Sequence, residues 1–159
     1  MSIPARLSDY LDQCEAEYDV RTHQLSRTSA ETARSAHIQP HQLAKSVVLE
    51  DEEGCVVAVL PADATVKLSE LSDLLDRRSL KLSKENRISE IFSGCDRGAV
   101  PAIGMAWGVE TVVDDDLGAN EEIFMESGDH ERLLRMSGEQ FQELMRGQKH
   151  GRFGQPTLH

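Results

Sequence analysis

Leu43-Ala-Lys-Ser-Val-Val-Leu-Glu50 is the stretch of sequence that decides the fold. After the polar connection Asp51-Glu-Glu-Gly54 comes a second apolar run, Cys55-Val-Val-Ala-Val-Leu-Pro61. Runs that are nearly continuous in apolar residues are typical of strands covered on both faces. The sequence therefore predicts a hairpin in the interior of a β-sheet, with one lysine, Lys45, at its entrance.

The rest of the chain mixes helical and strand signals around this hairpin. Helices are predicted over residues 4–14, 28–36, 68–75, 83–92 and 137–145, and a turn of helix is predicted at Pro40. Strands are predicted over residues 18–24, 79–82, 110–113, 122–125 and 130–136. This order predicts an α/β or α+β fold in which helices flank a mixed β-sheet core.

The expected domain organisation follows from the position at which the hydrophobic periodicity of the sequence ends. Residues 1–146 are expected to form a single domain, because no linker, repeat or low-complexity segment interrupts them. Residues 147–159 show no periodicity, so we expect them to form a mobile C-terminal tail.

The composition restricts the classes of function. The net charge of −11 disfavours non-specific nucleic-acid binding, and an aromatic content of 4% argues against a base-stacking platform. No apolar run approaches the roughly 20 residues of a membrane helix. The N-terminus also has no hydrophobic signal core. We therefore expect a cytoplasmic protein without a membrane partner.

Metal and cofactor sites receive no support from the sequence. The three cysteines include no C-x-x-C pair, so neither a disulfide framework nor a zinc site is expected. His37 and His41 have the spacing of a helical metal pair, but Pro40 breaks the helix between them. We expect no metal and no cofactor.

Three polar features stand out against this background. Lys45 opens the apolar hairpin, where its ammonium group either reaches water or is held as a fixed cation. The loop Gly98-Ala-Val-Pro-Ala-Ile-Gly104 is either a plain turn or a place where backbone amides approach a ligand. The turn Ser127-Gly-Asp-His130 presents a histidine that is either a surface residue or a proton-transferring group. The residues alone leave each pair of alternatives open.

Four segments, in one order, connect these features to a known family: Ala44-Lys-Ser-Val-Val48, Val59-Leu-Pro-Ala62, Gly98-Ala-Val-Pro101 and Ser127-Gly-Asp-His130. With them, the chain resembles the YbaK-type aminoacyl-tRNA deacylases from about Tyr18 to Met145. These are free-standing relatives of the editing insertion of bacterial prolyl-tRNA synthetase. The resemblance implies that family's fold and hydrolysis of the ester joining a wrong amino acid to tRNA. The implied partner is tRNA, through its 3′ aminoacyl end, with an aminoacyl-tRNA synthetase as a further one.

The resemblance also implies the site residues. It assigns catalysis to Lys45, to His130 facing it across the pocket, and to Gly98, whose loop holds the substrate. Substrate binding is assigned to a further set: Thr22, His23, Ala99, Val100, Pro101, Ser127 and Gly128. Relatives commonly carry Gly-x-x-x-Pro in the loop, whereas here Pro101 comes one position earlier and Ala102 takes the place of that proline. The edited amino acid is therefore left open, with alanine, serine or cysteine as the family expectation.

A concentration of basic residues offers a candidate contact for RNA. Six of the 17 basic residues lie within 21 positions: Lys67, Arg77, Arg78, Lys81, Lys84 and Arg87. They form either an RNA-facing patch or ordinary helix-surface charge.

Two other functions stay open beside editing. One is a catalytically inactive module that binds an aminoacyl or nucleotide ligand. The other is a hydrolase of a different small ester. Assays with mischarged tRNA and with free esters separate these readings.

Overall fold

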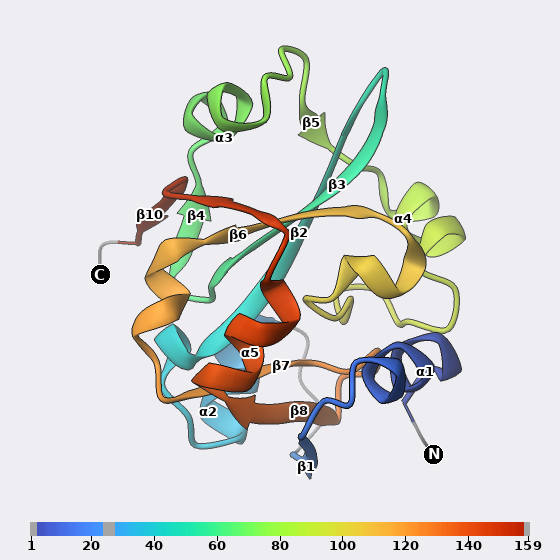
Figure 1. The fold of residues 1–159 in the computed structure, drawn as a ribbon, viewed down its shortest axis with the longest axis vertical. Coiled ribbons are helices and arrows are strands. Elements are labelled where there is room, and N and C mark those ends of the chain that lie inside the picture. Colours follow the sequence, from blue (N-terminus) through green and yellow to red (C-terminus); the bar gives the residue numbers. More distant parts are fainter. Residues whose placement is uncertain (1–2, 24–27, 158–159) are drawn as a thin grey trace.

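The centre of the fold is the hairpin that the sequence predicts. A computed structural model describes residues 3–23 and 28–157 of the chain. β2 (Leu43–Asp51) and β3 (Gly54–Pro61) pair in antiparallel register along the hairpin. Figure 1 shows these two strands crossing the middle of the molecule. The interior hairpin is therefore confirmed.

A mixed sheet is built outward from this hairpin. Its other strands are β1 (Asp19–Thr22), β5 (Lys81–Leu82), β6 (Glu110–Asp114), β7 (Glu122–Glu126), β8 (Arg132–Ser137) and β9 (Lys149–Gly151). The strand order is β1-β8-β7-β2-β3-β6-β9, and β5 pairs with the far end of β2. β7 runs parallel to β2 and β6 runs parallel to β3, whereas β8 is antiparallel to both of its neighbours. The predicted fold class, a mixed sheet with flanking helices, is confirmed.

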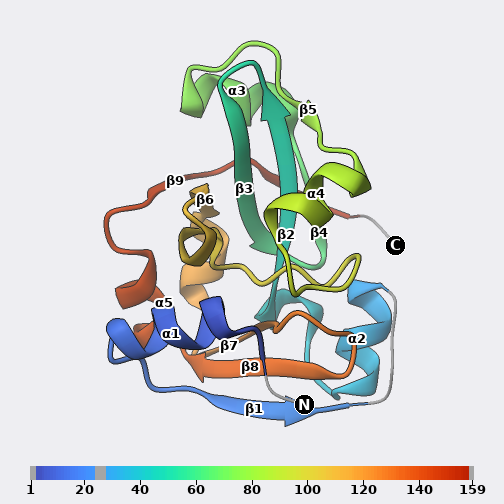
Figure 2. The same cartoon turned by 90° about the vertical axis from the view of Figure 1, so that its right-hand side faces the viewer.

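The pairing between β2 and β7 is short, and this matters for the site. Only Leu43 with Phe124 and Ala44 with Met125 form partners. Figure 2 shows that β7, β8 and β1 run across the foot of the β2–β3 hairpin instead of along it. Lys45, the next residue of β2, is thus the first one that does not pair with β7.

Helices and 3₁₀ turns flank the sheet. They are α1 (Ala5–Gln13), α2 (Ser29–Ser35), α3 (Leu68–Leu75), α4 (Glu85–Ile91) and α5 (Gly138–Met145), with 3₁₀ turns at Pro40–Gln42, Gly104–Trp107 and Asp115–Ala119. The side chains of Thr28 and Ser137 cap α2 and α5, as their capping-box patterns predict. The predicted helix over residues 83–92 begins later, because the Ser83 amide extends the β5 pairing by donating to the Val48 carbonyl. Within residues 3–23 and 28–157, no helix has the length and apolar character needed to cross a membrane.

Apolar side chains cover both faces of β3, as its continuous run predicts. Val57 and Val59 belong to a buried cluster that includes residues of α1 and α5. Ala58 and Leu60, which alternate with them, belong to a second cluster that includes residues of α3. Because β3 is buried on both sides, its partner β2 is held firmly where it carries Lys45.

The C-terminal segment, for which the sequence predicts a mobile tail, contains two short strands. β9 lies beside β6, and β10 (Gly154–Pro156) pairs with β4 (Ala64–Val66). Phe153, between β9 and β10, is fully buried, and its amide donates to the Asp114 carboxylate at 3.0 Å. Strands of three residues carry too little periodicity to be recognised from sequence, so the sequence does not predict this pairing.

Candidate functional site

Lys45 is a half-buried cation on β2. Its pKa is lowered because burial desolvates the ammonium group, and the nearby Asp63 carboxylate partly offsets this effect. Asp63 itself lies 3.4 Å from Nδ1 of His41. Within the described part of the chain, no carboxylate lies at ion-pair distance from the Lys45 ammonium. A cation with a fixed stem and no bound counter-ion is suited to a carbonyl or phosphate oxygen.

Lys45 and the buried part of the Gly98 loop lie on opposite faces of β2. Side chains alternate along a strand, and Ala44 shares a buried cluster with Val100 of the loop. The Lys45 side chain therefore projects from the other face of β2. None of the contacts among described residues joins Lys45 to His130 or Gly98. Their facing arrangement stays a prediction.

The Gly98 loop is a turn anchored by its own side chains. Gly98 is exposed and has a φ of +80°, a left-handed conformation that favours glycine. The Ala99 amide donates to the Asp96 carbonyl at 3.0 Å, so this amide is already bonded. Ala99, Val100 and Pro101 are all buried. These side chains fix the loop to the core, and their assignment to substrate binding stays a prediction.

The turn at Ser127 and Gly128 is held by contacts on both sides. The Ser127 hydroxyl donates to the Arg132 carbonyl at 2.9 Å, and the Asp96 amide donates to the Gly128 carbonyl at 2.7 Å. Gly128 has a φ of +111°, and a Cβ there would lie 2.9 Å from Cγ of Pro4. Glycine is therefore required at position 128 by both conformation and space.

His130 is joined directly to the Gly98 loop. Its Nε2 is hydrogen-bonded to the backbone carbonyl of Arg97. Because a carbonyl oxygen only accepts, Nε2 must carry the hydrogen, and the neutral ring keeps its lone pair on Nδ1. The structure thus brings His130 and the Gly98 loop together, with one ring nitrogen left to accept a proton.

Thr22 and His23 lie at the end of β1, against the start of β8. Thr22 is exposed and stands opposite Arg132 in the strand register. The His23 amide donates to the Glu131 carbonyl at 2.8 Å. Both residues are therefore next to the Ser127–His130 turn. Among the described residues, no group of three or more His, Cys, Asp or Glu side chains is arranged to hold a metal ion.

Glu126 is a further residue of this region, and the sequence does not single it out. It ends β7, directly before Ser127, and its side chain is 8% exposed. Oε1 accepts a hydrogen bond from the Thr32 hydroxyl at 3.2 Å, and Oε2 has no hydrogen-bond partner. Burial raises the pKa of Glu126 to about 8, an effect that the Thr32 hydrogen bond opposes and the Asp129 charge reinforces. In the sequence, Glu126 follows the apolar run Ile123-Phe-Met125, and nothing local indicates that its side chain is buried.

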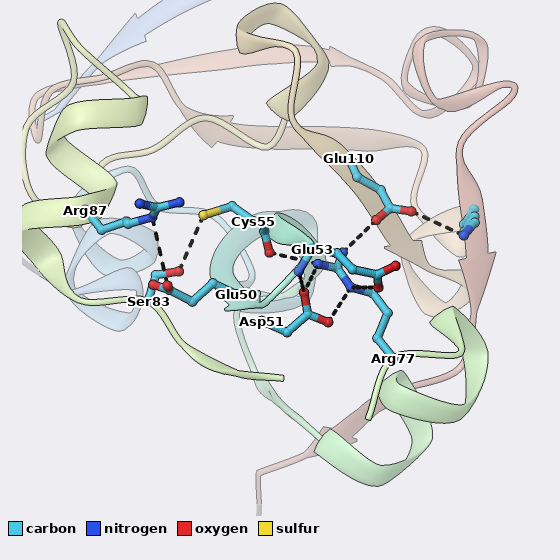
Figure 3. Close-up of polar contacts among 10 residues, drawn as sticks. Glu50, Asp51, Glu53, Cys55, Arg77, Ser83, Arg87 and Glu110 are labelled. Atoms are coloured by element: carbon cyan, nitrogen blue, oxygen red, sulfur yellow. Dashed lines mark hydrogen bonds and ion pairs between the residues drawn. The ribbon is translucent and has the colours of Figure 1, made fainter. Parts of the chain in front are cut away.

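Arg77 has a structural environment that excludes it from an RNA-facing patch. Its guanidinium donates to the Asp51 carboxylate, to Glu110 at 2.9 Å and to the Gly54 carbonyl at 2.8 Å. Figure 3 shows Asp51 and Glu110 on two sides of Arg77. The side chain is only 7% exposed, and the Arg77 contact helps to hold the pKa of Asp51 down at about 2. Arg77 clamps the hairpin tip, so its assignment to the patch is wrong.

The remaining basic residues are mixed with acidic ones. Lys81, Lys84 and Arg87 line a surface hollow of about 360 Å³ together with Glu50 and Glu90. Figure 3 also shows Arg87 directed toward Glu50, at 3.9 Å. The RNA-facing patch therefore stays a hypothesis for the exposed residues alone.

Comparison with solved structures identifies the fold. A protein described as "a putative trans-editing enzyme for prolyl tRNA synthetase" is 20% identical, with a TM-score of 0.83, over 97% of this chain and 99% of that one. "Hypothetical protein APE2540" is 20% identical with a TM-score of 0.82, over 94% and 99%. A "putative signal transduction protein from Marinobacter aquaeolei VT8" is 22% identical with a TM-score of 0.76, over 96% of this chain and 31% of that larger one.

Family membership rests on the sequence match. No curated protein matches the chain. The family model described as "Aminoacyl-tRNA editing domain" matches residues 23–144, which include Lys45, the Gly98 loop and the Ser127–His130 turn. Since the match covers most of the chain, the protein belongs to the aminoacyl-tRNA editing domain family.

Proposed function

We propose that the protein is a trans-editing deacylase. It hydrolyses the ester between a wrongly attached small amino acid and the 3′ end of tRNA, in the cytoplasm and without a metal or cofactor. The observation that carries this proposal is the editing-domain match, which takes in every polar feature that the sequence singles out. Its macromolecular partner is the 3′ aminoacyl end of tRNA, with an aminoacyl-tRNA synthetase as a second partner.

The proposed reaction needs stabilisation of negative charge on the ester carbonyl oxygen. Water adds to the carbonyl carbon, the bond from that carbon to the ribose oxygen breaks, and a proton passes to the ribose oxygen. The Lys45 ammonium is the candidate donor to the developing oxyanion, because it is fixed, partly desolvated and free of an acidic ion-pair partner among the described residues. Removal of one such donor typically lowers the rate by about 10²–10³.

His130, the last residue of the Ser127–His130 turn, is the candidate proton carrier. Its Nε2 hydrogen is engaged by the Arg97 carbonyl, which orients the ring and leaves Nδ1 to accept. A hydrogen bond from a ribose hydroxyl or from the attacking water fits this nitrogen. This role supports the proposal without requiring His130 to be the sole base.

The test is deacylation of a panel of mischarged tRNAs by the wild type and by Lys45→Ala. We expect rapid loss of one or two small amino acids by the wild type, and a loss of about 100-fold in rate with Lys45→Ala. Lys149→Ala is the matched control, since Lys149 is an exposed lysine on the edge strand β9 that pairs with Glu110. Absence of turnover on every tRNA by the folded wild type would overturn the proposal in favour of a binding module or another ester.

A further inference from the structure

Glu126 has a feature that the fold does not explain. A buried carboxyl group normally has partners for both oxygens, because an unpaired buried polar atom costs about 1–3 kcal/mol. Only Oε1 is bonded here, to the Thr32 hydroxyl, while Oε2 is buried without a partner. The Glu126 side chain is 8% exposed, so bulk water does not supply the missing bond.

The position of Glu126 connects it to Lys45. Ala44 of β2 is paired with Met125 of β7 in parallel register, so Lys45 and Glu126 are the next residues on the two strands. Leu43 and Phe124, one residue before the Ala44–Met125 pair, share a buried cluster. Since side chains alternate along a strand, Lys45 and Glu126 leave the same face of the sheet as that cluster.

An ammonium group and a carboxyl group on neighbouring strands match one feature of an aminoacyl ester. The ester carries its ammonium group and its carbonyl group on adjacent carbon atoms. Lys45 and Glu126 each lie one residue beyond the last β2–β7 pair, so one side chain from each strand is available for each of these groups. Lys45 is suited to the carbonyl oxygen, and a carboxylate oxygen is the natural acceptor for an ammonium group.

We propose that Oε2 of Glu126 binds the α-ammonium group of the aminoacyl ester and makes the site selective for esters with a free amino group. This inference rests on the proposed function and deepens it. An ester whose amine is acylated, such as a peptidyl-tRNA, offers no cation and leaves Glu126 unpaired. A site built to bond a substrate N–H rejects an analogue that lacks it by large factors. Glu126 thereby separates mischarged tRNA from the chains that a ribosome is extending.

The test compares alanyl-tRNA with N-acetyl-alanyl-tRNA, using the wild type, Glu126→Gln and Glu122→Gln. Glu122 is the matched control, because it is a carboxyl group on the same strand that pairs with Arg135 outside the site. We expect the wild type to prefer the free amine by at least about 100-fold in kcat/KM. Glu126→Gln should lose most of this preference by acting more slowly on alanyl-tRNA alone, and Glu122→Gln should keep it. Equal losses on both substrates, or an unchanged preference, would overturn the inference.

A second measurement separates this inference from the proposed function. The probes are 3′-amide-linked alanyl-adenosine, which resists hydrolysis, and its N-acetyl derivative. Binding of the free-amine probe at least 10-fold tighter than the acetylated one, with a shift of the Glu126 side-chain carboxyl ¹³C signal, supports the ammonium site even if no tRNA is deacylated. Equal affinity for the two probes overturns the site even if deacylation is rapid. Both readings use the wild type and do not depend on the folding of a variant.

Discussion

Lys45 and Glu126 leave the same face of two neighbouring strands, each one residue beyond the last β2–β7 pair. Burial acts on both in the direction of the neutral form: it lowers the pKa of the Lys45 ammonium and raises that of the Glu126 carboxyl. The described contacts include no ion pair between the two side chains. Each group therefore holds unused capacity for a ligand that carries the complementary charge.

The role of Lys45 can be resolved by separating kcat from KM. We expect Lys45→Ala to lower kcat on the edited tRNA by about 100-fold with little change in KM, because an oxyanion donor acts mainly in the transition state. Single-turnover kinetics with excess enzyme check the chemical step directly. A rise in KM at constant kcat would instead place Lys45 on a phosphate of the terminal adenosine.

Glu126 gives the folded protein a specific pH dependence. A carboxyl group with a pKa of about 8 in the folded protein and 4.5 as its ordinary value binds more protons folded than unfolded between these limits. Stability from this group is therefore present below pH 4.5 and is lost as the pH rises toward 8. Urea unfolding from pH 5 to 8 should show the wild type losing stability relative to Glu126→Gln, on the order of 1.4 kcal/mol per pH unit at most.

The contributions of other titrating groups cancel when the free energy of unfolding of Glu126→Gln is subtracted from that of the wild type. Thr32→Val is a useful companion, because it removes the one hydrogen bond that opposes the rise in pKa. It should leave the onset of the loss near pH 4.5 and extend the loss to higher pH, because the folded pKa sets where the loss ends. If the free energies of unfolding of the wild type and Glu126→Gln differ by the same amount from pH 5 to 8, Glu126 has an ordinary pKa in the folded protein.

The sequence predicts the parts of this fold that repeat over several residues. The continuous apolar runs of β2 and β3 specify a strand buried on both faces, and the capping boxes at Thr28 and Ser137 locate two helix starts. Arg77 shows the limit of such patterns. A basic residue in a charged stretch looks exposed, and only tertiary structure reveals that Asp51 and Glu110 enclose it.

The candidate site was also only partly accessible from sequence. Lys45 and His130 are visible because a charged residue stands beside an apolar run or after a glycine turn. Glu126 resembles a solvated strand end, because nothing local shows that Thr32 from a distant helix will meet it. Contacts between distant segments carry this information, and a single sequence does not contain them.

The Arg77 side chain should stabilise the fold, whereas the side chain of the adjacent Arg78 should not. Arg77→Leu leaves Asp51 without its cation beside the hairpin turn, and we expect unfolding to be easier by about 3 kcal/mol. Arg78→Leu is the matched control, since Arg78 is the adjacent basic residue and is exposed. Urea denaturation at pH 7 measures both variants.

At acidic pH, the difference in the free energy of unfolding between the wild type and Arg77→Leu should become smaller. The contact with Arg77 helps hold the pKa of Asp51 at about 2, below its ordinary 3.8, so the stabilisation is present above 3.8 and is lost as the pH falls toward 2. A gap of equal size at pH 7 and pH 2.5 would mean that Arg77 acts through packing of its aliphatic stem, not through the carboxylate.

The C-terminal segment should stabilise the fold through Phe153. This side chain is fully buried in the cluster beneath α3, and its amide is bonded to Asp114. Phe153→Ala is expected to cost about 3 kcal/mol, which for a chain of this size lowers Tm by about 10 °C. Gln155→Ala, an exposed change in the adjoining strand β10, should leave Tm nearly unchanged. Equal melting of the wild type and Phe153→Ala would restore the expectation of a loosely attached tail, because a residue that is not packed in solution leaves no cavity when it is shortened.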